Sequence, residues 1–146
     1  MRIKKIYHSD HGISERDILS VVELLAPKDG LFVLCDNPGG SYWCGLYGPL
    51  MGDNAVGESK VTYERRGDRE NLSRMIDLPY RKTAWVTVIG VREGDDLTIY
   101  TSYGGKPAER EPGDPTIAGN AALIDNAERF WAVHALSNHP YPKTEE

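Results

Sequence analysis

The sequence has few cysteines and no long hydrophobic run. Its two cysteines, Cys35 and Cys44, are nine positions apart, which matches no CxxC metal or redox motif. A disulfide between them would need an oxidising compartment. No apolar stretch reaches the roughly 20 residues of a membrane helix, and the first residues, MRIKKIYHSDHG, contain no signal-peptide core. We therefore expect a cytoplasmic protein with no membrane partner.

An excess of positive charge is also missing, so the molecule as a whole is not built to lie on nucleic acid. The formal net charge is −5, from 17 basic and 22 acidic residues. The charge is uneven, because the stretch from Lys60 to Lys82 holds seven basic residues against four acidic ones. The rest of the chain has ten against eighteen. These arginines are either paired with acids on a solvated surface or arranged as an anion-binding site.

The length of 146 residues and a hydrophobic content of 40% are typical of one globular domain. We predict a single domain over 1–139 and a polar tail over 140–146. Apolar residues at helical spacing predict an N-terminal helix over 15–26, which begins after Ser14 and ends before Pro27. The same spacing predicts a C-terminal helix over 123–137.

Strand patterns lie between the two helices and before the first one. Strands are predicted over 2–8, 31–35 and 61–64, and a β-hairpin over 83–91 and 97–103. The run 31–35 is apolar throughout, which is typical of an internal strand. We interpret 71–76 as a turn or a single helical turn, and 106–119 as an extended surface connection. The fold class is therefore α+β, with a mostly antiparallel sheet and both helices packed on it.

A glycine-rich segment without regular patterning covers residues 37–57. It contains Trp43 and Tyr47, which offer area to bury and argue against disorder. Its run GLYGPLMGD lacks the G-K-[ST] ending of a P-loop. We expect either an ordered loop that walls a cleft, with Trp43 and Tyr47 binding the ligand, or an inert lid on the core.

The candidate catalytic residues combine arginines with the hydroxyl-bearing end of the hairpin. Alternation along a strand places Thr101 and Tyr103 on one face, together with Ile99. Arginine holds phosphate through a bidentate fork, and Thr and Tyr hydroxyls donate to it. Arg74 and Arg81 are the predicted catalytic cations, and two further arginines are predicted to bind the ligand, Arg65 and Arg69. The alternative is that Thr101 and Tyr103 only pack across strands.

Histidines supply the candidates for proton transfer. His134 lies three positions after Trp131 and borders the apolar face of the predicted C-terminal helix. It is either a general acid or base or a hydrogen-bonded core residue. The spacing of His8, Asp10 and His11 does not complete a metal site, so we predict neither a metal nor a cofactor.

The run from Arg74 to Tyr103 resembles part of the small metal-independent ribonuclease toxins of the RelE and barnase-like kind. The resemblance covers about a fifth of the chain. It implies a nuclease-like or phosphoryl-transfer enzyme that acts on RNA or a nucleotide through an Arg/Tyr/His cleft. Those toxins are basic, however, and their helices precede the sheet. The phrases YGPLMGD, TSYGGKPAEREPGDP and FWAVHALS are also similar to an uncharacterised bacterial or phage family.

A second function fits the acidic composition. A non-catalytic binding or inhibitor protein, of bacterial or phage origin, would use the aromatic glycine-rich loop and the acidic surface to hold a basic protein partner. The positions of the arginines distinguish the two functions. Arginines gathered in one pocket with Tyr103 favour the enzyme, and arginines scattered in surface ion pairs favour the binding protein.

Overall fold

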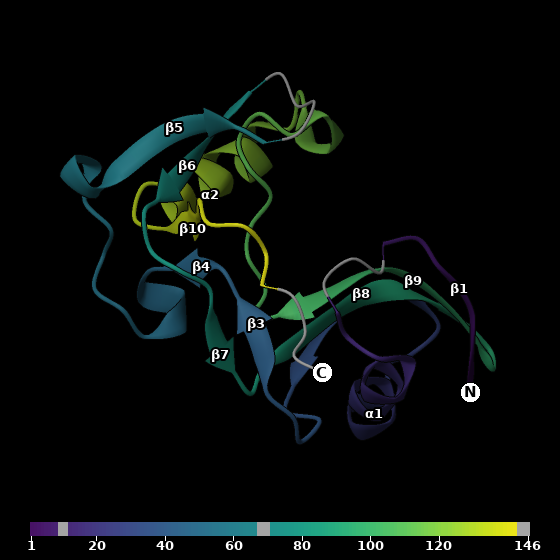
Figure 1. Ribbon diagram of the computed structural model, residues 1–146. Helices are drawn as coiled ribbons and strands as arrows, with labels where there is room; N and C mark the ends of the chain where they lie inside the picture. Colours follow the sequence, from purple (N-terminus) through teal and green to yellow (C-terminus); the bar gives the residue numbers. More distant parts are fainter. Residues whose placement is uncertain (9–11, 67–70, 143–146) are drawn as a thin grey trace. The chain divides into compact units, whose positions relative to one another are not determined.

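The computed structural model describes residues 1–8, 12–66 and 71–142. The chain divides into two compact units, each made of two separate stretches (Figure 1). Unit 1 comprises Met1–Cys44 and Arg81–Pro107, and unit 2 comprises Gly45–Tyr80 and Ala108–Glu146. That residues 1–139 form a single domain stays a prediction.

Unit 1 is a four-stranded sheet with a two-stranded ribbon and one helix. The strand order in the sheet is β1-β9-β8-β2, and β3 pairs with β7 in the ribbon. The elements are β1 (Arg2–Ile6), α1 (Glu15–Leu25), β2 (Gly30–Asp36), β3 (Tyr42–Cys44), β7 (Arg81–Thr83), β8 (Val86–Glu93) and β9 (Asp96–Gly104). β1 runs parallel to β9, and the other neighbours are antiparallel. The predicted hairpin is therefore confirmed as β8 and β9.

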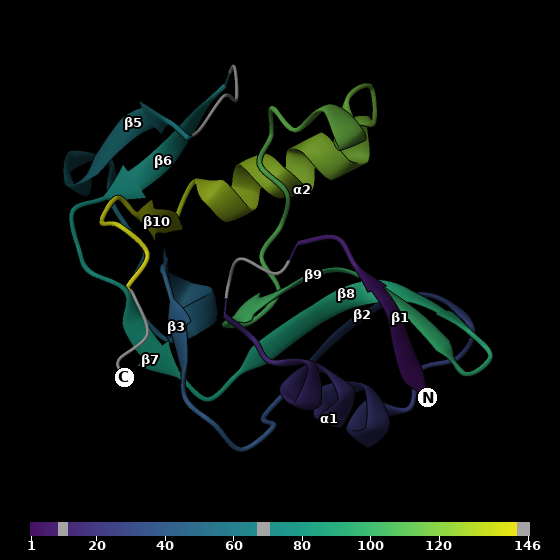
Figure 2. The same cartoon turned by 45° about the vertical axis from the view of Figure 1, so that its right-hand side comes forward.

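Helix α1 covers one face of this sheet, as two views show (Figures 1 and 2). It begins as the sequence predicts, because the Ser14 hydroxyl oxygen accepts a hydrogen bond from the Asp17 N–H at 3.1 Å. Ala26 follows the helix in a left-handed conformation, directly before Pro27. The buried face of α1 is part of a core of Ile13, Ile18, Val21, Val22, Phe32, Tyr42, Val86, Val88, Leu97 and Ile99, against which Ile3 and Ile6 of β1 also pack. Hydrophobic burial of this stripe holds α1 on the sheet.

A β-bulge in β9 changes which side chains share a face. Ile99 pairs with Gly90, but the next cross-strand partner, Ile89, pairs with Thr101. Tyr100 is the extra residue, and the alternation of the strand is reset there. Ile99 is fully buried against α1, whereas Thr101 lies on the opposite face. The prediction that Thr101 shares a face with Ile99 is therefore wrong, and we call the face opposite α1 the outer face.

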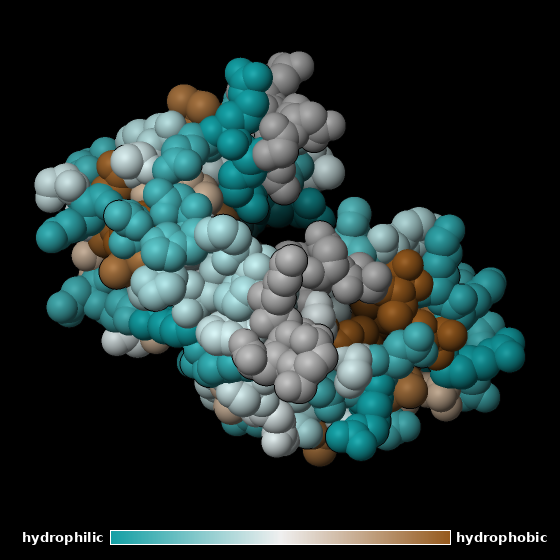
Figure 3. Space-filling model, in the orientation of Figure 1, coloured by the Kyte–Doolittle hydropathy of each residue, from teal (hydrophilic) through white to brown (hydrophobic). Residues whose placement is uncertain are grey.

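Strand β2 lies at the edge of the sheet, although its apolar sequence predicts an internal strand. Phe32 is buried against α1, but Leu31 is 71% exposed and Val33 is 54% exposed on the outer face. The space-filling view shows further hydrophobic side chains on unit 1, gathered beside β1 and α1 (Figure 3). The prediction of an internal strand over 31–35 is therefore wrong, because β8 is the one strand neighbour of β2 among the described residues and the outer side chains Leu31 and Val33 stay exposed.

Unit 2 is a second four-stranded sheet with one α-helix and three short 3-10 turns. Its strand order is β4-β10-β6-β5. The elements are β4 (Leu46–Tyr47), η1 (Pro49–Met51), η2 (Glu58–Lys60), β5 (Val61–Arg65), β6 (Leu72–Ile76), η3 (Pro115–Ile117), α2 (Ala121–Trp131) and β10 (Ala135–Ser137). β10 is parallel to β6 and antiparallel to β4. Tyr47, Val56, Ile76 and Ala135 form the core of this unit.

Three predicted features differ from the structure: a turn, the end of a helix and a loop that spans both units. Residues 71–76 contain strand β6 and not a turn, because they pair with both β5 and β10. The C-terminal helix ends at Trp131, and Ala135–Ser137 forms β10. The glycine-rich segment is not one loop, since β3, β4 and η1 lie within it. In each case pairing with distant strands overrides the local pattern.

The fold class is confirmed at the level of α+β with mostly antiparallel pairing. Five of the seven strand pairings are antiparallel. The helices are not terminal elements, however, because β1 precedes α1 and β10 follows α2. Among the described residues, no helix has the length and hydropathy to cross a membrane.

Candidate functional site

Two exposed tyrosines and a lysine gather at the β1–β9 side of unit 1. Lys5 pairs with Thr98 across the strands, so it points to the outer face, and Tyr7 follows two positions later. The Lys5 amine lies 4.3 Å from the centroid of the Tyr7 ring, and the rings of Tyr7 and Tyr100 are 5.8 Å apart. Tyr7 is 53% exposed and Tyr100 is 41% exposed. We call these three residues the aromatic–lysine cluster.

Two more lysine–aromatic contacts occur in the same unit. The Lys82 amine lies 4.1 Å from the Trp43 ring centroid, and the Lys106 amine lies 4.9 Å from that of Trp85. Unit 1 has nine basic and nine acidic residues, whereas unit 2 has eight basic and thirteen acidic ones. The net charge of −5 therefore belongs entirely to unit 2. Unit 1 has no net charge, and its lysines lie over the faces of aromatic rings.

The predicted catalytic residues of unit 1 lie on β9 and β7, the strands that also carry Tyr100 and Lys82. Thr101 pairs with Ile89 and Tyr103 pairs with Thr87, so the prediction that Thr101 and Tyr103 share a face holds. That face is the outer face. Arg81 is the first residue of β7, where it pairs with Cys44.

Arg74 and His134, the predicted catalytic residues of unit 2, are brought together through the backbone. Arg74 is 8% exposed, and its Nε donates to the carbonyl oxygen of His134 at 3.2 Å. Its other nitrogens donate to the Val56 carbonyl at 2.9 Å, the Tyr63 hydroxyl at 3.3 Å and the carboxylate of Glu58. One guanidinium thus ties together three segments of unit 2, which is a structural arrangement.

His134 uses both ring nitrogens in hydrogen bonds to the backbone. Nε2 accepts from the Leu50 N–H at 2.9 Å, so Nδ1 carries the proton and donates to the Phe130 carbonyl at 2.8 Å. The ring also stacks on Phe130 at 3.8 Å between centroids. Burial lowers the pKa of His134, although the Phe130 carbonyl and the charge of Asp53 act in the opposite direction. The neutral imidazole is the form that this site holds.

This environment predicts a pH dependence of stability. Because the pKa of His134 is lower in the folded state, the unfolded chain binds more protons between the two pKa values, and stability is lost as the pH falls below about 6.5. The loss is at most about 1.4 kcal/mol per pH unit. Urea unfolding of wild type and His134→Gln at pH 5 and pH 7.5 measures it, since Gln keeps an acceptor but does not titrate. An equal pH dependence in both proteins would contradict this assignment.

The described members of the predicted ligand-binding set, Tyr47, Arg65 and Trp43, lie on three different strands. Tyr47 is buried in β4 and its hydroxyl donates to the Pro79 carbonyl, so it belongs to the core of unit 2. Arg65 ends β5 and is exposed. Arg69 lies outside the described residues. Trp43 sits in the β3–β7 ribbon under Lys82. Within the glycine-rich segment, Tyr47 is therefore a core residue of unit 2, and Trp43 is part of the β3–β7 ribbon.

Residues 1–8, 12–66 and 71–142 contain no group of three or more His, Cys, Asp or Glu side chains that could bind a metal ion. Of the His8, Asp10 and His11 set, Asp10 and His11 lie outside those ranges. No disulfide joins Cys35 and Cys44 in this structure, and burial raises the pKa of Cys35.

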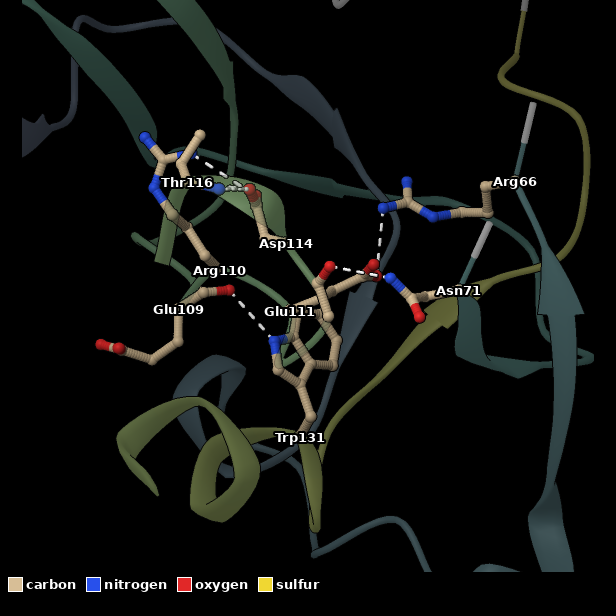
Figure 4. Close-up of polar contacts among 9 residues, drawn as sticks. Arg66, Asn71, Glu109, Arg110, Glu111, Asp114, Thr116 and Trp131 are labelled. Carbon is tan, nitrogen blue, oxygen red and sulfur yellow. Dashed lines mark hydrogen bonds and ion pairs between the residues drawn. The ribbon is translucent and has the colours of Figure 1, made fainter. Parts of the chain in front are cut away.

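Figure 4 shows how the acidic, proline-rich segment after unit 1 is held in unit 2. The carboxylate of Glu111 accepts from Arg66 at 3.1 Å and from the buried Ser73 hydroxyl at 2.9 Å. Asn71 donates to the Gly113 carbonyl at 2.8 Å, and the Trp131 indole donates to the Glu109 carbonyl at 3.0 Å. Arg66 and Arg74 of the arginine cluster are thus both paired with carboxylates, Arg66 with Glu111 and the buried Arg74 with Glu58.

Comparison with known proteins gives a likeness of fold and no family. No protein-family model and no curated protein matches the chain. A crystal structure of a conserved hypothetical protein from Toxoplasma gondii ME49 aligns over 92% of this chain and 90% of that one, with a TM-score of 0.54 and 14% identity. At this identity the similarity is evidence for the fold alone.

The aromatic–lysine cluster is a group that sequence reasoning missed. Tyr7 and Tyr100 are separated by most of the chain and meet only because β1 inserts beside β9 in parallel. Tyr100 itself is exposed through the bulge, which no local pattern announces. The one signal in the sequence was Tyr7 near the end of the predicted strand 2–8, two positions after Lys5.

Proposed function

We propose that this protein binds single-stranded RNA or a nucleotide on the outer face of the unit 1 sheet, through the aromatic–lysine cluster. The observation that carries the proposal is the contact between Lys5, Tyr7 and Tyr100, two exposed rings beside one cation. Exposed aromatic rings stack on bases, and a neighbouring ammonium neutralises the phosphate that follows each base. Thr101 and Tyr103 add hydroxyls on the same face.

Catalysis by the predicted Arg/Tyr/His cleft has weaker support than binding. Proton transfer by His134 would require it to release the Leu50 N–H or the Phe130 carbonyl. Arg74 is likewise committed to two backbone carbonyls and a carboxylate. Cleavage of RNA would therefore have to rely on groups of unit 1, with Arg81, Thr101 and Tyr103 as the predicted participants.

Fluorescence anisotropy with a labelled 12-nucleotide oligouridine, in buffer containing EDTA, tests the proposal. Each stacked base contributes roughly 1–3 kcal/mol, so the double variant Tyr7→Ala/Tyr100→Ala should weaken binding at least about 30-fold. Lys5→Gln should reduce the salt dependence of log K by about 0.7, the value for one lost contact to single-stranded phosphate. Gel analysis of the same mixtures reports any cleavage.

The matched control is Tyr141→Ala, which removes an accessible tyrosine from unit 2. It should bind RNA as the wild type does, and circular dichroism verifies the fold of every variant. Unchanged affinity in the double variant would refute the site. If wild type binds neither oligonucleotide nor mononucleotide, the function proposed here is wrong. The acidic surface of unit 2, with thirteen acids against eight bases, would then favour a basic protein partner.

A further inference from the structure

Strand β2 has apolar side chains on both faces, but Leu31 and Val33 on its outer face are exposed. Its sequence GLFVLCD is apolar on both faces, which is typical of a strand covered on both sides. Phe32 and Leu34 pack toward α1, while Leu31 and Val33 face outward and are among the most exposed large hydrophobic side chains of the described residues. Two neighbouring aliphatic side chains on an edge strand form a surface that favours contact with a partner.

The two edges of the unit 1 sheet differ in how they resist pairing. β1, at one edge, carries Arg2, Lys4 and Lys5, and lysines on an edge strand oppose the addition of another strand. β2, at the other edge, has no charged residue between Gly30 and Cys35 and no proline. Among the described residues β8 is its one strand neighbour, so the other side of the strand presents unpaired backbone groups.

We propose that a second copy of this chain pairs with β2 in antiparallel fashion, which joins two unit 1 sheets into one. A two-fold axis perpendicular to the sheet keeps the outer faces of both copies on the same side. Only registers that pair residues of equal parity then match outer side chains with outer side chains. The register with Phe32 on the axis places Leu31 beside Val33 of the second copy, and Val33 beside Leu31 of the second copy.

Charge complementarity selects this register among its neighbours. With Phe32 on the axis, the segment that leads into β2 and holds Lys28 runs toward Asp36 at the end of β2 in the second copy, within reach of the long lysine side chain, and the symmetry repeats the pair. Lys28 is exposed and Asp36 is half-buried, so both are accessible. A shift of two residues either way loses the ion pairs and places Leu31 or Val33 on the axis. β2 is thus complementary to itself in one register.

The oligomeric state in solution tests this inference independently of RNA binding. Sedimentation equilibrium of the full chain should show a monomer–dimer equilibrium in the micromolar range. Val33→Lys should raise the dimer dissociation constant at least about tenfold, because it places a charge in both of the Leu31–Val33 contacts of the junction. Leu31→Lys, at the more exposed position, is a second variant should Val33→Lys fail to fold. Thr98→Lys, on the outer face of β9 away from β2, should dimerise as the wild type does.

A charge reversal tests the register itself. Lys28→Glu and Asp36→Lys should each weaken the dimer, and the double variant should recover it, since both ion pairs are restored with opposite sign. A monomeric wild type at all accessible concentrations would overturn the inference, as would a dimer that Val33→Lys and Leu31→Lys leave intact. If the double variant does not regain the dimer affinity of the wild type, the proposed register is wrong.

Discussion

Replacing Arg74 with methionine should lower the free energy of unfolding by about 2–4 kcal/mol. The effect is on stability, because Arg74 has a structural role. Methionine keeps the apolar stem but removes the donors that satisfy the carbonyls of Val56 and His134 inside unit 2. Each buried acceptor left without its partner costs roughly 1–3 kcal/mol. Glu58 is 70% exposed, so water solvates its carboxylate when Arg74 is lost, and the broken ion pair adds little to the destabilisation. Urea unfolding followed by circular dichroism measures the change.

Arg65→Met is the matched control, because Arg65 belongs to the same arginine cluster but is exposed at the end of β5. It should change stability by less than about 0.5 kcal/mol. Arg74→Lys should also be destabilising, since a single ammonium cannot reach the acceptors that the guanidinium binds in three directions. A fully stable Arg74→Met protein that had lost an RNA-dependent activity would contradict the structural role and return Arg74 to the catalytic candidates.

Gly48→Ala should be at least as damaging, with an expected loss of about 2–5 kcal/mol. Gly48 has φ 142°, which side chains rarely adopt, and a β-carbon there would overlap the ring of His134. The ring cannot simply move, because its two nitrogens hold the Leu50 N–H and the Phe130 carbonyl. Strain and steric overlap therefore act together at this position. The midpoint of thermal unfolding is the measurement.

Gly52→Ala separates the two contributions. Gly52 lies in the same glycine-rich segment with φ 86°, but a β-carbon there would meet no neighbouring atom. It should lose only the strain energy, about 1 kcal/mol. Equal effects at both glycines would show that the contact with His134 contributes nothing, and that the segment is held by the backbone alone.

The candidate site was predictable only in part. The sequence correctly placed Thr101 and Tyr103 on one face. That Arg74 and His134 share a cleft with them stays a prediction. The sequence could not show that Arg74 contacts the His134 carbonyl and not its ring, because that depends on β10 lying parallel to β6. It also could not find Tyr7 beside Tyr100, since that contact joins the two ends of the described unit 1 chain. Side-chain partners across distant strands leave no local trace.

What the sequence determined by itself is local. Ser14 and Pro27 bound α1, and the alternation on both sides of Gly94 makes the β8–β9 hairpin, because caps and turns act within a few residues. Only the tertiary structure decided that Leu72–Ile76 is a strand, that α2 ends at Trp131 and that β2 lies at an edge. Backbone pairing between distant segments fixes those outcomes, and its free energy exceeds the small differences in intrinsic preference that a sequence displays.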